Sequence, residues 1–331
     1  MAKLRVGFIG AGFIAGVHAE RLSKFEEIEI VAFTDIVREK AQNLASKYGG
    51  NVYTDYHEMF SKEKLDAVYI CIPPFAHKDE VMIAAENGIH VFIEKPIALD
   101  LRLAEEMVKS VEKNGVKSQV GYVFRFTAGI SEAKRLIESG DVGKVLHFQC
   151  AYLGNMLFLI GKKHWWKDES KGGGHIVEQV THVYDTVRYL LGEADEVFSY
   201  TSRFMEKVDP DWRVEDGHVA VLKMRNGAIV SMFSSACYRG FNWLWRIICE
   251  KAVMELPNPH KIMVWFREND EEKIVEKNLD FYAEESRDFI NAILNDRDTK
   301  VPIREGYNTL KLTLAVKKAA KLGKPIKLDE L

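Results

Sequence analysis

Two side chains that could move a proton, Glu178 and His182, stand four residues apart in a stretch predicted to be helical from about Gly173 to Leu191. Residues at this spacing lie on one face of a helix, and Asp185 is three residues further on. A carboxylate one turn from an imidazole orients the ring and raises its basicity, which suits a general base working near neutral pH. The alternatives are a solvated polar stripe or half of a helical metal site. No third ligand accompanies the pair, so we predict no metal.

Lys95 is the second candidate for chemistry. It follows a predicted buried strand, His90–Glu94, and precedes Pro96, which restricts the backbone at that point. A cation at a strand end can steady the developing charge on an alcohol oxygen while a base removes its proton. The other interpretation is a lysine that faces solvent from a loop.

The elements that must position these residues begin with a glycine turn. Leu4–Ile9 is a predicted strand, Gly10-Ala11-Gly12 breaks it, and a helix is expected over residues 13–24. A strand that ends in a glycine turn at a helix N-terminus is a site for a pyrophosphate. Gly10 permits the tight turn, and Gly12 lets the backbone approach the phosphates.

Asp35 closes the next predicted strand. A carboxylate at this position can accept two hydrogen bonds from the adenosine ribose, and it repels a 2′-phosphate, which indicates NAD as the cofactor. The alternative is a polar loop residue that caps the following helix. Arg38 lies close by and could soften the preference for NAD, so NADP is the other candidate cofactor.

The order of elements predicts two domains. Up to residue 121, short β-rich runs alternate with helices of about a dozen residues, which indicates a parallel, doubly wound α/β sheet. Beyond it, successive strands with short turns indicate an α+β domain with a large, mainly antiparallel sheet. We predict a nucleotide domain over residues 1–121 and a substrate-binding and oligomerisation domain over 122–331, with one sheet face open to a partner subunit. The predicted strands are 4–9, 28–34, 51–53, 67–72, 90–94, 117–121, 144–152, 195–202, 214–224, 228–236, 244–250, 252–256 and 262–266, and the predicted helices are 13–24, 37–48, 75–88, 100–113, 127–139, 173–191, 281–294 and 305–322.

Composition excludes several classes of partner. A formal net charge of −3 over 331 residues gives no reason to expect nucleic acid or an anionic membrane surface. No run of about 18 apolar residues is present, and the first strand begins too early for a signal peptide. The cysteines are scattered, without C-x-x-C spacing, and are expected to be reduced thiols of a cytoplasmic protein with no zinc site: Cys71, Cys150, Cys237 and Cys249.

Three motifs together resemble the glucose–fructose oxidoreductase/inositol dehydrogenase (Gfo/Idh/MocA) family. They are the glycine turn at residues 10–15, the tripeptide Glu94-Lys95-Pro96, and the G-G-G-x-x-x-[acid]-x-x-x-H-x-x-D run at 172–185. PPFAH with Pro74 and His77, AAENGIHVFIEKPIA and AKLGKPIKL extend the likeness over nearly the whole chain. The resemblance implies a Rossmann domain, an open-faced sheet domain, and NAD(P)-dependent oxidation or reduction of sugars or polyols.

The resemblance also implies residue roles. Lys95 would position and polarise the reacting hydroxyl, and His182 would accept its proton. Where the family usually has aspartate, this chain has Glu178. The additional methylene displaces the carboxylate by about an angstrom, which matters for a positioned group.

Further residues complete the predicted site. The glycines before Glu178 allow a ligand to approach the backbone closely. Arg125 is a candidate for contact with substrate or cofactor, or else a surface arginine. Trp166 is a candidate for a sugar wall or for loop packing, and Tyr282 stands where the family often has a tyrosine. The predicted catalytic residues are Lys95, His182 and Glu178; the predicted cofactor contacts are Gly10, Gly12, Phe13, Ile14, Asp35, Arg38, Pro73, His77, Glu94 and Lys95; the predicted substrate contacts are Arg125, Trp166, His175 and Tyr282.

The sequence therefore predicts an NAD-dependent dehydrogenase of a small carbohydrate, assembled as a homodimer or homotetramer through the second sheet. One alternative is a redox-neutral, NAD-dependent glycoside hydrolase on the same scaffold, which oxidises, eliminates and re-reduces. A second is a non-catalytic regulator that senses dinucleotide. A regulator of this kind is expected to lose the lysine or the histidine, and both are present here.

Overall fold

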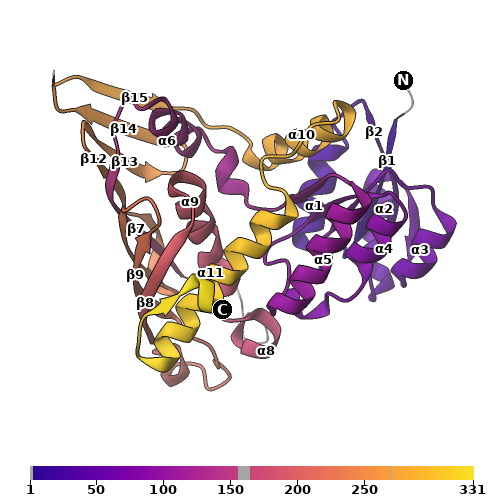
Figure 1. The fold of residues 1–331 in the computed structure, drawn as a ribbon. Coiled ribbons are helices and arrows are strands. Elements are labelled where there is room, and N and C mark those ends of the chain that lie inside the picture. The colour runs from indigo at the N-terminus through magenta and orange to yellow at the C-terminus, as the bar shows by residue number, and fades with distance from the viewer. Residues whose placement is uncertain (1–2, 156–164, 269) are drawn as a thin grey trace. The chain divides into compact units, whose positions relative to one another are not determined.

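The computed structural model describes residues 3–155, 165–268 and 270–331, and it divides the chain into two compact units. The first unit is Met1–Val123 with Asp280–Tyr307, and the second is Phe124–Leu279 with Asn308–Leu331 (Figure 1). The first boundary lies two residues beyond the predicted Gly121. The segment Asp280–Tyr307, which the sequence-based division places in the second domain, packs with the first unit.

The first unit is built on a six-stranded parallel sheet in the order β3-β2-β1-β4-β5-β6. The predicted parallel α/β sheet is thereby confirmed. The strand order reverses between β1 and β4, and ligands of such sheets bind beyond the carboxyl ends of strands at this switch point. The strands are β1 (Leu4–Ile9), β2 (Ile28–Thr34), β3 (Asn51–Tyr53), β4 (Ala67–Ile70), β5 (His90–Ile93) and β6 (Ser118–Val120), and the helices are α1 (Phe13–Leu22), α2 (Arg38–Tyr48), α3 (Tyr56–Lys62), α4 (Glu80–Glu86), α5 (Leu101–Asn114) and α10 (Phe281–Leu294).

Apolar packing explains why a segment late in the chain belongs to the first unit. Helix α10 packs on α1, and its Phe289 and Ile290 are fully buried in the same core cluster as Ala15 and Ala19 of α1. Phe289 also meets the rings of Tyr69 and Phe92 edge-on, with centroids 5.7 and 5.8 Å apart. Burying such aromatic surface stabilises the fold by roughly 2–3 kcal/mol per side chain.

The second unit is built on a large mixed sheet in the order β15-β14-β13-β12-β7-β10-β9-β8-β16, with β11 paired to β7. Its strand pairs are antiparallel except β7 with β10, so the predicted mainly antiparallel sheet is confirmed. The strands are β7 (Val145–Asn155), β8 (Ala194–Ser202), β9 (Gly217–Met224), β10 (Ile229–Ser235), β11 (Cys237–Trp243), β12 (Trp245–Cys249), β13 (Ala252–Asn258), β14 (Lys261–Phe266), β15 (Glu272–Glu276) and β16 (Ile326–Lys327), and the helices are α6 (Ala128–Ser139), α8 (Glu169–Gly172), α9 (Thr181–Leu191) and α11 (Ile303–Leu322), which the division crosses after Tyr307.

Some elements differ from their predicted form. The helix expected at 75–88 is a 3₁₀ turn, Pro74–Ala76, followed by α4, because His77 between them is extended. The helix expected at 173–191 starts with a π-helical turn, Ile176–Val180. Five further elements were not predicted from the sequence: α3, the single turn α8, β11, β15 and β16. Within the described residues, no helix combines the length and apolarity needed to cross a membrane.

Candidate active site

The glycine turn lies at the carboxyl end of β1 and is fixed by its neighbours. The Gly10 N–H donates to the carbonyl of Thr34 at 2.8 Å, and Gly10 has φ +88°. A Cβ at Gly10 would lie 2.4 Å from the carbonyl oxygen of Cys71, so only glycine fits. At Gly12, the N-cap of α1, a Cβ would meet nothing within 4 Å, and no side chain caps the helix. No side chain therefore satisfies the first amides of α1, and an anion can bind there.

Alanine substitutions at the two glycines should affect different properties, namely stability at Gly10 and cofactor binding at Gly12. Gly10→Ala should lower the unfolding temperature, because left-handed backbone costs a non-glycine residue about 1–2 kcal/mol and its Cβ would meet a backbone oxygen that cannot rotate away. Gly12→Ala should leave that temperature nearly unchanged and weaken NADH binding, because its Cβ fills the space that a phosphate needs. Thermal unfolding and NADH fluorescence titration measure both. NADH affinity in Gly12→Ala equal to that of the original protein would contradict a phosphate site at this turn.

Asp35 lies directly after β2 and fixes two loops. Its Oδ2 accepts the Ala11 N–H of the glycine turn at 2.9 Å, and its Oδ1 accepts the Val37 N–H just before α2 at 2.8 Å. The carboxylate thus holds the start of α2, and each of its oxygens keeps a second lone pair that can accept from a ribose hydroxyl. Capping of the helix and binding of the ribose are therefore compatible. Arg38 is the first, exposed residue of α2.

Exposed apolar side chains surround this edge of the first unit. Phe13 is 87% exposed, Ile36 92%, Phe75 47% and Val37 40%. All four follow the carboxyl ends of β1, β2 or β4 within a few residues. Large apolar side chains left in water at one edge of a sheet mark a binding surface. A dinucleotide, whose two flat ring systems flank a charged pyrophosphate, fits this edge and the uncapped amides of α1.

His77 adds a buried polar atom to the same edge. Its Nδ1 lies 2.5 Å from Oε1 of Glu80, both side chains are buried, and its Nε2 has no hydrogen-bond partner. A buried polar atom without a partner costs free energy unless a ligand or water satisfies it. Pro73 and Ile14 are half-buried at the neighbouring strand end and helix start.

Lys95 lies just beyond β5, and the Glu94 carboxylate holds its backbone. Oε2 of Glu94 accepts the Lys95 N–H at 3.2 Å, and Oε1 lies 2.8 Å from Nε2 of the fully buried His18. Gly121 underlies the same carboxylate, since a Cβ there would be 2.7 Å from Oε2. The ring of Tyr282 meets His18 edge-on at 5.8 Å, and burial raises the pKa of the Tyr282 hydroxyl. His18, which is buried against this carboxylate, was not predicted from the sequence as part of the site.

In the second unit, Asp185 differs in its contacts from Glu178 and His182, the other two residues of the predicted helix face. Asp185 is fully buried and takes the guanidinium of Arg125, with Nε–Oδ2 at 2.8 Å and Nη2–Oδ1 at 2.6 Å. Arg125 is itself 3% exposed, so it is not a surface arginine, and it anchors α9. Glu178 is buried in the π-helical turn, whereas His182 is half-buried with its ring 4.7 Å from that of Phe124.

The glycine run before Glu178 is crowded by protein. Gly174 has φ +91°, and a Cβ there would lie 2.4 Å from Oε2 of Glu215. The Glu215 carboxylate accepts the Ile176 N–H at 3.0 Å. The Lys317 ammonium donates to the Gly173 carbonyl at 2.5 Å and lies 3.6 Å from the Glu215 carboxylate. Burial raises the pKa of Glu215. Glu215 and Lys317 thus fix the start of the helix, and both were missed because they are distant in sequence.

His175 and Trp166 flank the glycine run differently. His175 is buried, its Nε2 has no hydrogen-bond partner, and burial lowers its pKa to about 4. It is therefore neutral near pH 7 and can donate to or accept from a hydroxyl. Trp166 packs against a cluster that contains Met205 and Trp212, which favours the packing interpretation.

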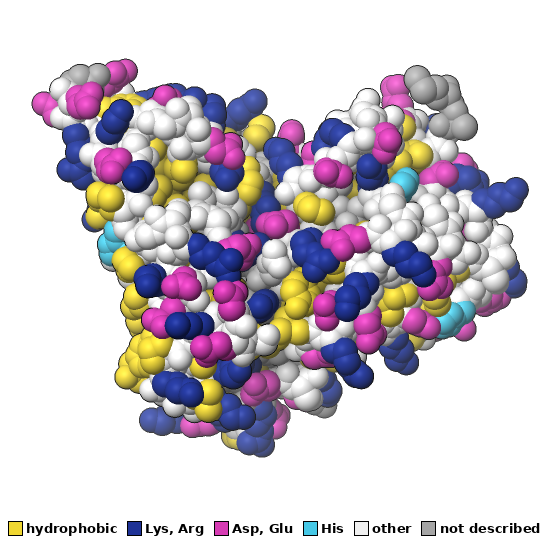
Figure 2. Space-filling view, viewed as in Figure 1, with side chains coloured by type: hydrophobic (Ala, Val, Ile, Leu, Met, Phe, Trp, Pro, Cys, Tyr) yellow, Lys and Arg dark blue, Asp and Glu magenta, His cyan; other side chains and the backbone are white. Residues whose placement is uncertain are grey.

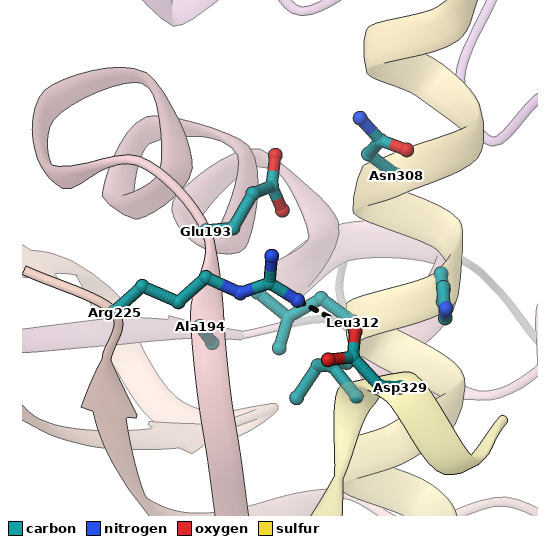
Figure 3. A pocket seen from close by; sticks show the side chains of 8 residues that line it. Glu193, Ala194, Arg225, Asn308, Leu312 and Asp329 are labelled. Carbon is teal, nitrogen blue, oxygen red and sulfur yellow. Dashed lines mark hydrogen bonds and ion pairs between the residues drawn. The ribbon is translucent and has the colours of Figure 1, made fainter.

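Other features of the described chain lie apart from these residues. All four cysteines are unpaired thiols, of which only Cys237 is exposed, and no three His, Cys, Asp or Glu side chains in the described part of the chain gather as metal ligands. A pocket of about 200 Å³ in the second unit contains none of the predicted site residues (Figure 3). Its Arg225 pairs with Asp329 at 2.5 Å. The residues lining it are Glu193, Ala194, Arg225, Asn308, Lys311, Leu312, Leu328 and Asp329.

The structure gathers the predicted residues in two groups. Gly10, Gly12, Phe13, Asp35 and His77 lie at the carboxyl edge of the first unit's sheet, as do Glu94 and Lys95. His175, Glu178 and His182 lie along one helical segment of the second unit. A parallel sheet with a glycine turn, an acceptor carboxylate and uncapped helix amides defines a dinucleotide-binding Rossmann domain, here combined with an open-sheet domain.

Comparison with known proteins gives the family. Residues 4–122 match the model of the oxidoreductase family with an NAD-binding Rossmann fold, and residues 130–255 match the GFO/IDH/MocA C-terminal domain. The chain belongs to the Gfo/Idh/MocA family of oxidoreductases, as the sequence motifs predicted. Its cofactor is NAD.

Among its relatives is the 2,7-anhydro-N-acetylneuraminate hydratase of Mediterraneibacter gnavus, 34% identical over 203 residues that cover 61% of this chain and 53% of the relative. The chain thus aligns with about half the length of that hydratase. The myo-inositol 2-dehydrogenase of Thermotoga maritima is 25% identical over 99% of both chains. Levoglucosan dehydrogenase, solved in complex with NADH and levoglucosan, shares the fold with a TM-score of 0.90 at 21% identity, covering 98% of this chain and 99% of that one.

Proposed function

We propose that this oxidoreductase transfers a hydride between NAD and a hydroxyl or carbonyl carbon of a sugar, polyol or related carbohydrate. The observation that carries the proposal is the retention of both Lys95 and His182 in restrained surroundings. Lys95 follows a buried carboxylate that binds its own backbone N–H, and His182 packs on Phe124 one turn after a buried glutamate.

The proposal assigns each side chain a separate task. NAD, when bound, supplies the hydride acceptor. His182 accepts the hydroxyl proton at its imidazole, and Glu178 raises the basicity of that ring. The Lys95 ammonium steadies the negative charge that develops on the substrate oxygen. His175, neutral because of its burial, suits recognition of a further hydroxyl by hydrogen bonding.

A second candidate is supported by the hydratase relative. A redox-neutral enzyme of this scaffold would use the same proton-transfer residues but return the hydride within one catalytic cycle, with no net NADH. The full-length similarity to an inositol dehydrogenase favours net oxidation, whereas the higher identity to the hydratase is confined to 61% of this chain.

We also propose that the protein is a homodimer or homotetramer through the open face of the second sheet. Hydrophobic side chains gather along the margin of that unit near β8 and β9 (Figure 2). Tyr200 and Val219 are exposed register partners, and Val221, the partner of Phe198, is exposed beside them. A contiguous apolar sheet face of this kind fits a like surface on a second copy.

A substrate panel tests the function. Purified protein would be assayed with myo-inositol, D-glucose, glucose 6-phosphate and levoglucosan, with NAD and with NADP, by the absorbance of the reduced cofactor. We expect reduction of NAD in preference to NADP with at least one compound, because Asp35 repels a 2′-phosphate. Anhydro-sugars and glycosides would be assayed in parallel by mass spectrometry. Their conversion without net NADH would establish the redox-neutral alternative instead.

A further inference from the structure

The Glu178 carboxylate is tied to the sheet of its own unit by two consecutive hydrogen bonds. The Tyr152 hydroxyl of β7 donates to Oε1 of Gln179 at 3.0 Å, and Nε2 of Gln179 donates to Oε2 of Glu178 at 2.5 Å. Tyr152 and Glu178 are 7% and 5% exposed, and Gln179 between them is half-buried, so both ends of the chain of bonds are shielded from bulk water. We call Tyr152, Gln179 and Glu178 the carboxylate relay.

We propose that Tyr152 and Gln179 are positioning residues that hold the Glu178 carboxylate in one orientation. This assignment rests on the proposed function, because that function gives Glu178 its task beside His182. Neither Tyr152 nor Gln179 belongs to the site expected from the sequence.

The chemistry of the carboxamide explains why the tyrosine matters. An amide has a donor end and an acceptor end, and only its partners decide which way it faces. Because the Tyr152 hydroxyl donates to Oε1, Nε2 faces Glu178 and can bond to an ionised carboxylate, which is an acceptor only. A reversed amide would present Oε1 to the carboxylate, so that two acceptor oxygens would face each other. The Tyr152 hydroxyl therefore fixes the end of Gln179 that bonds to Glu178.

The surroundings keep both ends of the relay rigid. Glu178 and Gln179 lie in the π-helical turn Ile176–Val180, a backbone form that often occurs at functional sites. The Tyr152 ring meets Trp243 of β11 at 6.0 Å, and Trp243 meets Phe124 at 4.8 Å. Phe124 in turn packs on the His182 ring at 4.7 Å. One wall of aromatic side chains thus supports both the tyrosine of the relay and the proposed base.

Removing only the tyrosine hydroxyl tests the relay. Tyr152→Phe should lower kcat on the panel sugars by about five- to tenfold with little change in KM, the scale of one buried hydrogen bond. In a Glu178→Gln background the same change should have no further effect, because an amide at position 178 bonds to either end of Gln179. Tyr184→Phe is the matched control. It deletes another buried hydroxyl of this unit, one that lies 2.7 Å from Nε2 of His218, and should lower stability without lowering kcat.

A spectroscopic measurement makes the test independent of turnover. In protein labelled with ¹³C at the glutamate carboxyl carbon, the Glu178 signal is the one absent from Glu178→Gln. Tyr152→Phe should shift that signal, because the hydrogen bond from Gln179 to the carboxylate is no longer held in one orientation, and Tyr184→Phe should not. An unmoved signal, or an equal loss of kcat with and without Glu178, would overturn the relay. If no panel sugar is turned over while the signal still moves, the relay stands and the proposed reaction falls.

Discussion

Replacing His182 or Lys95 with alanine should lower turnover at least about a hundredfold while NADH still binds, because each change removes one group that handles the reacting hydroxyl. Without the imidazole, the hydroxyl proton has no acceptor of suitable basicity. Without the ammonium, the developing oxygen charge loses a stabilising cation. Steady-state kinetics on the best panel sugar, together with NADH fluorescence titration of both variants, measures the two quantities separately.

Conservative variants sharpen this expectation. Lys95→Arg retains a cation and should keep more activity than Lys95→Ala, whereas Lys95→Met keeps the length of the side chain and none of the charge. Unaltered turnover in both alanine variants would remove the proposed chemistry.

Measuring both product and NADH in these variants separates dehydrogenation from the redox-neutral alternative. Both reactions need proton transfer, so both fail without His182. Only dehydrogenation consumes NAD in proportion to product. A variant series in which product formation and NADH formation fall together therefore supports net oxidation, and product formed with no NADH supports the hydratase-like cycle.

The fold could be predicted from the sequence where one local pattern decides the structure. β1 and β2 are apolar runs between clear turns, and their predicted bounds agree with the structure. β11 was missed because Cys237–Trp243 lacks alternation: five of its seven residues are exposed, Gly240 has φ +92°, and its register with β7 is irregular. α3 has only seven residues, too few for a helical period to show in the sequence.

The candidate site could be predicted only in part, because spacing along a helix does not reveal distant partners. In the sequence, nothing distinguishes the roles of Glu178, His182 and Asp185 on one helix face. Only the structure shows that Asp185 pairs with Arg125, sixty residues earlier in the chain. The glycine run predicted a close approach, but Glu215 is the group that approaches Gly174. The π-helical turn has no sequence signature either, since the same residues are compatible with an α-helix.

The buried pair Arg125–Asp185 should be the most costly ion pair to break. Two hydrogen bonds join the side chains, and Asp185 also accepts from Thr309 of α11 at 3.3 Å. Since a guanidinium that is 3% exposed cannot recover its hydration, Asp185→Ala leaves a buried charge without its carboxylate. Such a loss costs about 3–5 kcal/mol. At roughly 2–4 °C per kcal/mol for a unit of this size, the unfolding temperature should fall by about 6–20 °C.

An exposed pair in the same unit provides the control for this effect. Arg225 and Asp329 lie 2.5 Å apart, but their side chains are 53% and 78% exposed, so Asp329→Ala should change the unfolding temperature little. A double variant, Arg125→Met with Asp185→Leu, removes both buried charges and should recover much of the loss, because the penalty comes from the isolated charge rather than from the missing bond. Differential scanning calorimetry of the three variants measures the temperatures. If Asp185→Ala unfolds no earlier than Asp329→Ala, the pair does not anchor α9, and the position of His182 one turn before Asp185 must be set by the glycine run and its Glu215–Lys317 contacts instead.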